Sequence, residues 1–141
     1  MRYIYRARCE KITDGDTIEL DLDLGCHIHR YETCRLYRIN SPESYGVKKG
    51  SEEWKGGMAA KYRLAELVFE SFDKPEKWND PITGESKPLI VETIKDKTGK
   101  FGRLLAWVYV DTGEPAPVIV QQGMSVNRQL VEEGFAEWKD Y

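Results

Sequence analysis

Hydrophobic and polar residues alternate along the first forty positions of the chain. The alternation is loose over residues 3–12 and strict over 16–24, which read DTIELDLDL. Strict alternation is typical of a strand with one buried face, and an Asp-Gly pair between two such runs is a common hairpin turn. We therefore predict two antiparallel strands joined at Asp14-Gly15, followed by a third strand over 27–39. The residues predicted to face the core from the second strand are Ile18, Leu20, Leu22 and Leu24.

A longer apolar period marks a helix in the middle of the chain. Over residues 53–72 apolar side chains recur every three to four positions, as on one face of a helix. Segment 73–88 contains three prolines and a glycine, so we predict a long surface loop there. The predicted buried stripe of the helix consists of Met58, Tyr62, Ala65, Val68, Phe69 and Phe72.

The second half of the chain predicts two more strands and a short helix. Apolar residues dominate 88–95 and 103–111, whereas 112–123 is rich in turn residues and is predicted as a surface excursion. Residues 125–133 predict a short helix that ends at Gly134, because glycine is preferred just past a helix C-terminus.

Three strands, a helix, two strands and a helix is the element order of an OB-fold barrel. We predict an α+β protein, mainly β, with a five-stranded OB-fold barrel, a helix between strands three and four, and a short C-terminal helix. A chain of 141 residues has the size of one domain, so residues 1–141 are assigned to a single domain.

The composition is that of an ordinary globular protein. Hydrophobic residues make up 40% and charged residues 32% of the chain, and no apolar run approaches the length of a membrane span. The N-terminus, MRYIYRARCEKI, has strand character and lacks the apolar stretch of a signal peptide, and the three cysteines are odd in number and unclustered. We expect a cytoplasmic monomer with reduced thiols and no membrane partner.

Charge is unevenly distributed. The net charge of −3 argues mildly against a nonspecific nucleic-acid binder, because such proteins are usually basic. Much of the acid lies in 19–23, 52–53 and 132–140, so a local positive patch on an acidic body remains compatible with the sequence. Cations gather in two short segments, at Lys48, Lys49, Lys95, Lys97, Lys100 and Arg103.

Two carboxylates flank the first predicted turn. Asp14 and Asp16, in the sequence DGDT, are two residues apart and can lie on the same side of the strand entry. Asp-Gly is also the commonest hairpin signal, so a plain turn is the better explanation of this motif taken alone.

A second polar cluster ends the third predicted strand. Asn40-Ser41-Pro42-Glu43 is compatible with a plain turn, since proline restricts Ser41 to an extended conformation. Together with Asp16, however, this corner can supply a side-chain oxygen, a backbone carbonyl and a free carboxylate. These are the components of a site for a hard cation with a general base beside it.

Two arginines stand in otherwise apolar predicted strands, where an unpaired guanidinium is costly. Arg35 and Arg103 therefore either form internal salt bridges or snorkel to solvent, or they act as a pair of bidentate ligands for a phosphate.

The Cys26-His27-Ile28-His29 stretch places two imidazoles on one face of a predicted strand. Zinc would need two further ligands, and no second Cys or His pair stands at suitable spacing. Exposed strand residues are the better explanation.

Taken in order, these pieces resemble the staphylococcal nuclease (thermonuclease) family over nearly the whole chain. Each motif is weak alone, but five in register, at intervals of the right size and on a predicted barrel, form a strong signal. The motifs are DGDT at 14–17, RLYRINSPE at 35–43, VKKG at 47–50, KFGR at 100–103 followed by LLAWVYV, and VNRQLVEEGFA at 126–136.

The resemblance implies a calcium-dependent nuclease that hydrolyses the phosphodiester bonds of DNA or RNA, with Mg²⁺ as an alternative metal. It places the metal ligands on Asp16, Asn40 and the backbone carbonyl of Ser41, and the general base on Glu43. A divalent cation and guanidinium groups would stabilise the negative charge that develops on the phosphate oxygens. The resemblance further assigns phosphate binding to Arg35 and Arg103, and substrate binding to Lys49, Lys100 and Phe101.

The chain departs from the family pattern at several positions. Asn40 stands where the best-known member has Asp, so one negative charge is missing and weaker metal affinity is expected. Phe101 replaces a tyrosine, and Gly99 replaces the acid that opens the KFGR-like motif. The family's third helix has no clear counterpart before Tyr141, and Trp138 and Tyr141 are the aromatics nearest to its nucleotide-stacking tyrosines.

These departures leave a second hypothesis open. The chain can instead be a catalytically weak or inactive OB-type module that binds nucleic acid or a protein. Asn40, the acidic net charge and the missing helix favour this alternative, whereas the presence of Asp16, Glu43, Arg35 and Arg103 favours the nuclease.

Overall fold

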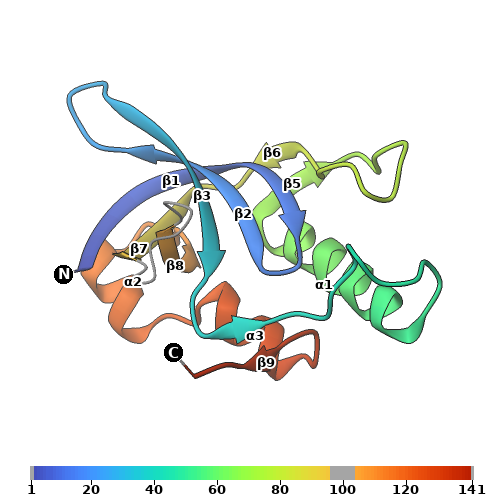
Figure 1. Cartoon of the computed structure of the whole chain (residues 1–141). Coiled ribbons are helices and arrows are strands. Elements are labelled where there is room, and N and C mark those ends of the chain that lie inside the picture. The colour runs from blue at the N-terminus through green and yellow to red at the C-terminus, as the bar shows by residue number, and fades with distance from the viewer. Residues whose placement is uncertain (1, 96–103, 141) are drawn as a thin grey trace.

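Five strands close into a barrel in the computed structural model, which describes residues 2–95 and 104–140 (Figure 1). The barrel strands are β1 (Arg2–Asp14), β2 (Thr17–Asp23), β3 (His29–Leu36), β7 (Leu89–Lys95) and β8 (Leu104–Val110). Their order is β1-β2-β3-β8-β7, and neighbours are antiparallel except β3 and β8, which run parallel. The predicted α+β class and the five-stranded barrel are confirmed.

The long strand β1 makes closure possible, because its first half pairs with β7 and its second half with β2. Irregularities in its register with β2, near Cys9 and Ile12, bend it between the two partners. The predicted alternation in β2 is observed as well: Ile18, Leu20 and Leu22 are buried. Leu24 was wrongly placed in this stripe, because β2 ends at Asp23 and Leu24 is exposed.

One long helix packs against the barrel. α1 (Glu52–Val68) begins after Ser51, whose hydroxyl accepts a hydrogen bond from the backbone N–H of Trp54, and it buries Leu64 and Val68 in the core. The prediction that the helix continues to residue 72 is wrong. β5 (Phe69–Phe72) is extended instead, because its backbone pairs with β6 (Gly84–Ser86), a distant segment that the local apolar period does not reveal.

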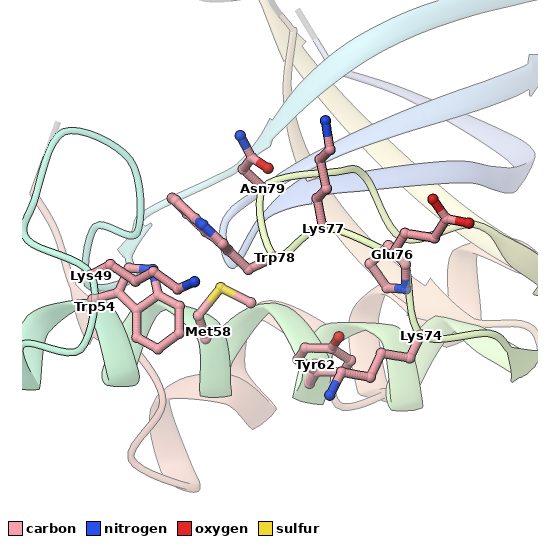
Figure 2. Close-up of a pocket in the computed structure, with 10 residues that line it drawn as sticks. Lys49, Trp54, Met58, Tyr62, Lys74, Glu76, Lys77, Trp78 and Asn79 are labelled. Carbon is pink, nitrogen blue, oxygen red and sulfur yellow. The ribbon is translucent and has the colours of Figure 1, made fainter.

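The segment predicted as a loop over 73–88 is more structured than expected. Besides β6, it contains Ile82, which is fully buried and exchanges backbone hydrogen bonds of 2.9 Å with Ile12. Residues 74–79 lie over α1 (Figure 2). The prolines indicate turns correctly, but a single buried isoleucine is too weak a pattern to predict the anchor.

The surface excursion predicted over 112–123 contains a helix, α2 (Ala116–Gln122), so that prediction was wrong for these residues. Pro115 precedes the helix, and Ile119 is buried against Ile90 and Tyr109 on the outside of the barrel. The run Val118-Ile119-Val120 has no helical period, which is why the helix is not apparent in the sequence.

The short helix near the C-terminus was predicted correctly. α3 (Val126–Glu132) is capped by Ser125, whose hydroxyl accepts a hydrogen bond from the backbone N–H of Arg128, and Gly134 follows the helix with φ +85°. Asn127 is fully buried and bonds the backbone of Tyr37, Ala106 and Val108 at 2.9–3.1 Å, which ties α3 to the barrel. None of the helices in the described parts of the chain is long and apolar enough to cross a membrane.

The strand predicted over 27–39 is interrupted. β3 ends at Leu36, and Arg38, with φ +65°, turns the chain into β4 (Ile39–Asn40), which pairs with β9 (Glu137–Trp138). Arg38 is thus an exposed turn residue, not a strand residue, and its guanidinium lies 3.7 Å from the carboxylate of Asp140.

The two histidines do not share a strand face. Cys26 and His27 form the β2–β3 turn with φ of +52° and +62°, and only His29 belongs to β3, where its Nδ1 lies 2.8 Å from the carboxylate of Asp21. Within residues 2–95 and 104–140, no group of three or more His, Cys, Asp or Glu side chains is arranged to hold a metal ion.

Candidate active site

Asp16 lies at the entrance to β2 and is almost fully buried. Its Oδ2 accepts the backbone N–H of Ser41 at 3.1 Å, and its Oδ1 accepts the hydroxyl of Thr17 at 3.2 Å. Its backbone carbonyl accepts the N–H of Leu36 at 2.8 Å, next to the site where β3 ends. These bonds compensate the burial of the charge and hold the carboxylate against residues 40–41.

Gly15 lets this turn pack tightly. A Cβ at Gly15 would stand 2.7 Å from the Cβ of Ala60 on α1 and 2.8 Å from the Oγ of Ser41. Real Cβ atoms essentially never approach so closely, so the Asp-Gly pair does more than form a hairpin turn. It allows α1, the turn and residue 41 to meet at one point.

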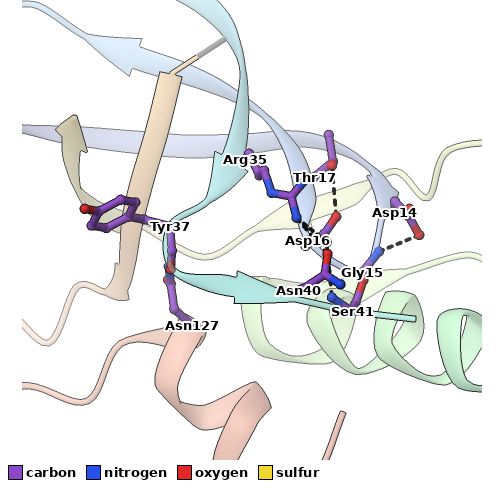
Figure 3. Close-up of polar contacts among 9 residues, drawn as sticks. All are labelled: Asp14, Gly15, Asp16, Thr17, Arg35, Tyr37, Asn40, Ser41 and Asn127. Carbon is purple, nitrogen blue, oxygen red and sulfur yellow. Dashed lines mark hydrogen bonds and ion pairs between the residues drawn. The ribbon is translucent and has the colours of Figure 1, made fainter. Parts of the chain in front are cut away.

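Arg35 extends from β3 toward Asp16 and Asn40 (Figure 3). Its Nη2 lies 3.4 Å from Oδ2 of Asp16 and donates a hydrogen bond of 2.8 Å to Oδ1 of Asn40. The strand register explains this placement, because Arg35 pairs with Thr17 and so lies beside Asp16. Its Nε is buried and has no hydrogen-bond partner within the described residues.

The corner after β4 is wedged against α1. A Cβ at Gly57 would stand 2.7 Å from the carbonyl oxygen of Pro42 and 2.9 Å from the carbonyl carbon of Glu43, so only glycine permits this contact. Ser41 and Ser44 are buried within the corner. The helix therefore fixes the backbone that carries Glu43.

Glu43 itself is exposed and lines a shallow pocket of about 300 Å³. Asn40 and Ser41 line the same pocket, together with Glu53 from α1 and Glu137 from β9. Glu43 is therefore open to solvent, and it shares a pocket with Asn40 and Ser41, the two residues that contact Arg35 and Asp16.

Asp14 joins this cluster from the other side of the turn. Its Oδ1 accepts the hydroxyl of Ser44 at 3.2 Å and the backbone N–H of Gly15 at 2.9 Å. Burial raises the pKa of Asp14 above its ordinary value of 3.8, and the negative charges of Asp16 and Glu43 raise it further. Asp14, Thr17 and Ser44 thus join the cluster in addition to the predicted site residues; the DGDT motif contains the first two, whereas no sequence motif marks Ser44.

The oxygen atoms of this cluster suit a hard divalent cation. A carboxylate, a side-chain amide oxygen and a backbone carbonyl are the ligand types that calcium takes in proteins, and Asp16, Asn40 and Ser41 provide one of each. The side-chain oxygens of Asp16 and Asn40 already converge on one positively charged nitrogen of Arg35. The residues present therefore fit the metal that the resemblance implies.

Four of the predicted site residues are not found among the described residues of the cluster around Asp16 and Arg35. Lys49 is exposed and lies beside Trp54 at the edge of a larger groove along α1. Lys100, Phe101 and Arg103 lie outside the described residues, and their assignments stay predictions.

A family model described as staphylococcal nuclease homologue matches residues 33–141. The match begins in β3 and includes Arg35, Asn40, Ser41 and Glu43, whereas Asp16 precedes it. A search of curated proteins returned no match. The contact between Asp16 and the matched region is therefore an observation of the structure and not of the family match.

Proposed function

The chain belongs to the staphylococcal nuclease homologue family, and we propose that it is a metal-dependent nuclease that hydrolyses phosphodiester bonds of DNA, RNA or both. One observation carries the proposal: the Arg35 guanidinium lies between Asp16 and Asn40, at the base of the corner that presents Glu43 to solvent. This arrangement supports the proposal, because the proposed metal ligand Asn40 contacts the proposed phosphate ligand Arg35 and lines the same pocket as the proposed base Glu43.

We assign the metal to Asp16, Asn40 and the backbone carbonyl of Ser41, with Ca²⁺ as the proposed ion and Mg²⁺ as the alternative. When bound, a divalent cation neutralises charge on the phosphate oxygens. Asp16 supplies the negative charge in this ligand set, because Asn40 contributes an uncharged amide. Weaker binding than in a site with two carboxylates is expected for this reason.

Glu43 is assigned as the general base. Its exposed carboxylate accepts a proton from a water molecule, whose oxygen forms the new bond to phosphorus as the bond to the ester oxygen breaks; the departing oxygen takes up a proton from solvent and leaves as a hydroxyl group.

Arg35 is assigned to the phosphate, with Arg103 as its proposed partner. A guanidinium offers parallel N–H groups that match two phosphate oxygens. The Nε of Arg35 is buried and has no hydrogen-bond partner within the described residues, so a phosphate oxygen would satisfy it once the side chain turns to expose it. Such preorganised donors stabilise the charge that develops on the equatorial oxygens.

A second candidate function rests on one contact. Arg35 donates to the Oδ1 of Asn40, the very oxygen assigned to the metal, and this bond can stabilise a module that binds without cleaving. Such a module would bind single-stranded nucleic acid or a protein, show no cleavage with any divalent cation, and gain no thermal stability from millimolar Ca²⁺.

The deciding experiment is digestion of plasmid DNA and of RNA by the purified chain with Ca²⁺ or Mg²⁺, against EDTA. Cleavage that requires the metal and disappears in Glu43→Gln supports the nuclease. Cleavage that persists in both EDTA and Glu43→Gln would refute the mechanism. Absence of cleavage in every metal, combined with tight binding, would establish the second candidate.

A further inference from the structure

A groove of about 620 Å³ runs between α1 and residues 74–79 (Figure 2). Trp54, Met58 and Tyr62 rise from α1 to form its floor, and Trp78 and Lys74 reach over it from the opposite wall. The groove is distinct from the pocket that contains Glu43.

The outer wall of the groove is held in place by hydrogen bonds from Lys61 and Tyr45. Lys61 is almost fully buried, and its Nζ donates to the backbone carbonyls of Asp80 and Trp78 at 2.8 and 3.3 Å. The hydroxyl oxygen of Tyr45 lies 2.9 Å from the carbonyl oxygen of Asn79 and 3.1 Å from that of Thr13, so its one proton is donated to either carbonyl or shared between them. Because Lys61 and Tyr45 bind carbonyls of residues 78–80, the backbone that carries Trp78 is held in place before a ligand binds.

Aromatic rings dominate the interior of the groove. Trp54 and Trp78 pack edge to face with ring centroids 5.6 Å apart, and Tyr45 continues the cluster, 5.8 Å from Trp78. Trp54, Tyr62 and Trp78 are only partly buried, so part of each ring remains available to a ligand. Flat apolar rings of this kind offer stacking faces to nucleobases.

The rim of the groove is basic although the chain as a whole carries a net charge of −3. Lys49, Lys74 and Lys77 are exposed around the aromatic cluster, and Glu76 is the acidic residue among the residues that line it. Exposed lysines around aromatic rings are the combination that binds single-stranded nucleic acid, with cations on phosphates and rings on bases.

The groove adjoins the proposed catalytic corner. Residues 42–44 pack on Gly57, which lies between Trp54 and Met58 in the α1 sequence. Tyr45, which directly follows Ser44, is part of the aromatic cluster. The corner and the groove therefore adjoin along α1.

We infer that this groove binds a single-stranded segment of the nucleic-acid substrate, beyond the nucleotide that is cleaved. The inference rests on the proposed function, and it adds a second contact region that favours long unpaired substrates over short ones. The bases stack on Trp54 and Trp78, and Lys74 and Lys77 contact the phosphates. Flat stacking faces distinguish this occupant from an acidic peptide, which would use the lysines alone.

The test measures binding separately from cleavage. The full chain is titrated in EDTA against a labelled single strand of about twelve nucleotides, within the usual site size of such proteins, at several salt concentrations. Trp54→Leu is expected to weaken binding by roughly 5- to 150-fold, since stacking of this kind has that range of effects. Lys77→Gln is expected to lower the slope of log K against log salt by about 0.7, the contribution of one phosphate contact.

Matched controls are available on the same molecule. Lys55→Gln removes the same charge from α1, but Lys55 does not line the groove and pairs with Glu52. Tyr31→Leu removes an exposed aromatic ring from β3. Both controls should bind like the original chain.

The outcomes separate this inference from the proposed function. With Ca²⁺, Trp54→Leu and Lys77→Gln should raise KM for the long strand and leave cleavage of a dinucleotide unchanged. Groove-dependent binding without cleavage by the original chain would support the groove and refute the nuclease. Three results would overturn the inference. The first is an unchanged oligonucleotide affinity in Trp54→Leu, and the second is an equal effect of Lys77→Gln and Lys55→Gln on the salt dependence of binding. The third is an equal loss of cleavage activity on the dinucleotide and on the long strand.

Discussion

The Nη2 of Arg35 lies 2.8 Å from the Oδ1 of Asn40, so a proposed phosphate ligand is hydrogen bonded to a proposed metal ligand. The same nitrogen lies 3.4 Å from Oδ2 of Asp16. A guanidinium and a metal ion would therefore draw on the same two oxygens. Whether the guanidinium or the metal ion binds these oxygens more tightly depends on the charge of residue 40, and Asn40 is uncharged.

Asn40→Asp should tighten Ca²⁺ binding by about fivefold or more. A second carboxylate adds at least about 1 kcal/mol of attraction to a cation at contact distance, even in a water-like dielectric. Isothermal titration calorimetry measures the affinity directly. Gln121→Glu, which adds the same charge at an exposed position on α2, is the control and should leave the affinity unchanged. An unchanged affinity in Asn40→Asp would count against the proposed metal site.

Glu43→Gln should lower kcat by roughly a hundredfold or more, because general-base catalysis contributes on the order of 10² to 10⁴ in rate. Folding should be unaffected, since Glu43 is exposed. The measurement is steady-state cleavage of a labelled strand, with thermal unfolding recorded in parallel. Glu53→Gln removes a charge from the same pocket and should retain most of the activity. Equal losses in the two variants would show that the pocket's charge, and not Glu43 itself, is what matters.

Gly57→Ala should lower both stability and activity. The added Cβ would stand 2.7 Å from the carbonyl oxygen of Pro42, so either α1 or the corner must shift, at a cost of about 1–3 kcal/mol. Thermal unfolding and kcat report the two effects. Gly56→Ala meets only the Pro42 ring, at 3.1 Å, and should be milder. If Gly57→Ala were as stable and active as the original chain, the corner would not be wedged against the helix as described.

Asp14→Asn should raise the thermal midpoint at neutral pH. Because the pKa of Asp14 is raised in the folded chain, its charged form destabilises the fold at any pH above that raised value. As the pH falls through the folded pKa toward the ordinary value of 3.8, the original chain takes up the proton and the advantage of the variant should shrink to nothing. Thermal unfolding of both proteins between pH 3 and 8 tests this.

Glu133→Gln should change stability with pH in the opposite direction, because the pKa of Glu133 is lowered and not raised. Arg63 and Gln129 donate to this carboxylate and lower its pKa to about 2. Its contribution to stability should therefore be present above pH 4.5 and be lost as the pH falls toward 2.

For Asp14→Asn, in contrast, a difference in thermal midpoint from the original chain that grew on acidification would contradict the raised pKa of Asp14.

Local patterns predicted the barrel well. The strict alternation in β2 and the Asp-Gly turn indicated the first hairpin, and the five strands, α1 and α3 were all found near their predicted positions. The failures share a cause. β5 and the anchor at Ile82 depend on backbone pairing with distant segments, and α2 has a single buried residue, Ile119, so no local period marks them.

The sequence by itself determined which residues are available for chemistry: a carboxylate at 16, an amide at 40 and a carboxylate at 43, in motifs that resemble one family. Only the tertiary structure decided that Asp16 receives the Ser41 N–H and that Arg35 joins Asp16 to Asn40. It alone placed Trp54 beside Trp78. Residue identity and spacing along a chain define local preferences, whereas these contacts require barrel closure and the packing of α1, which join segments that are remote in sequence.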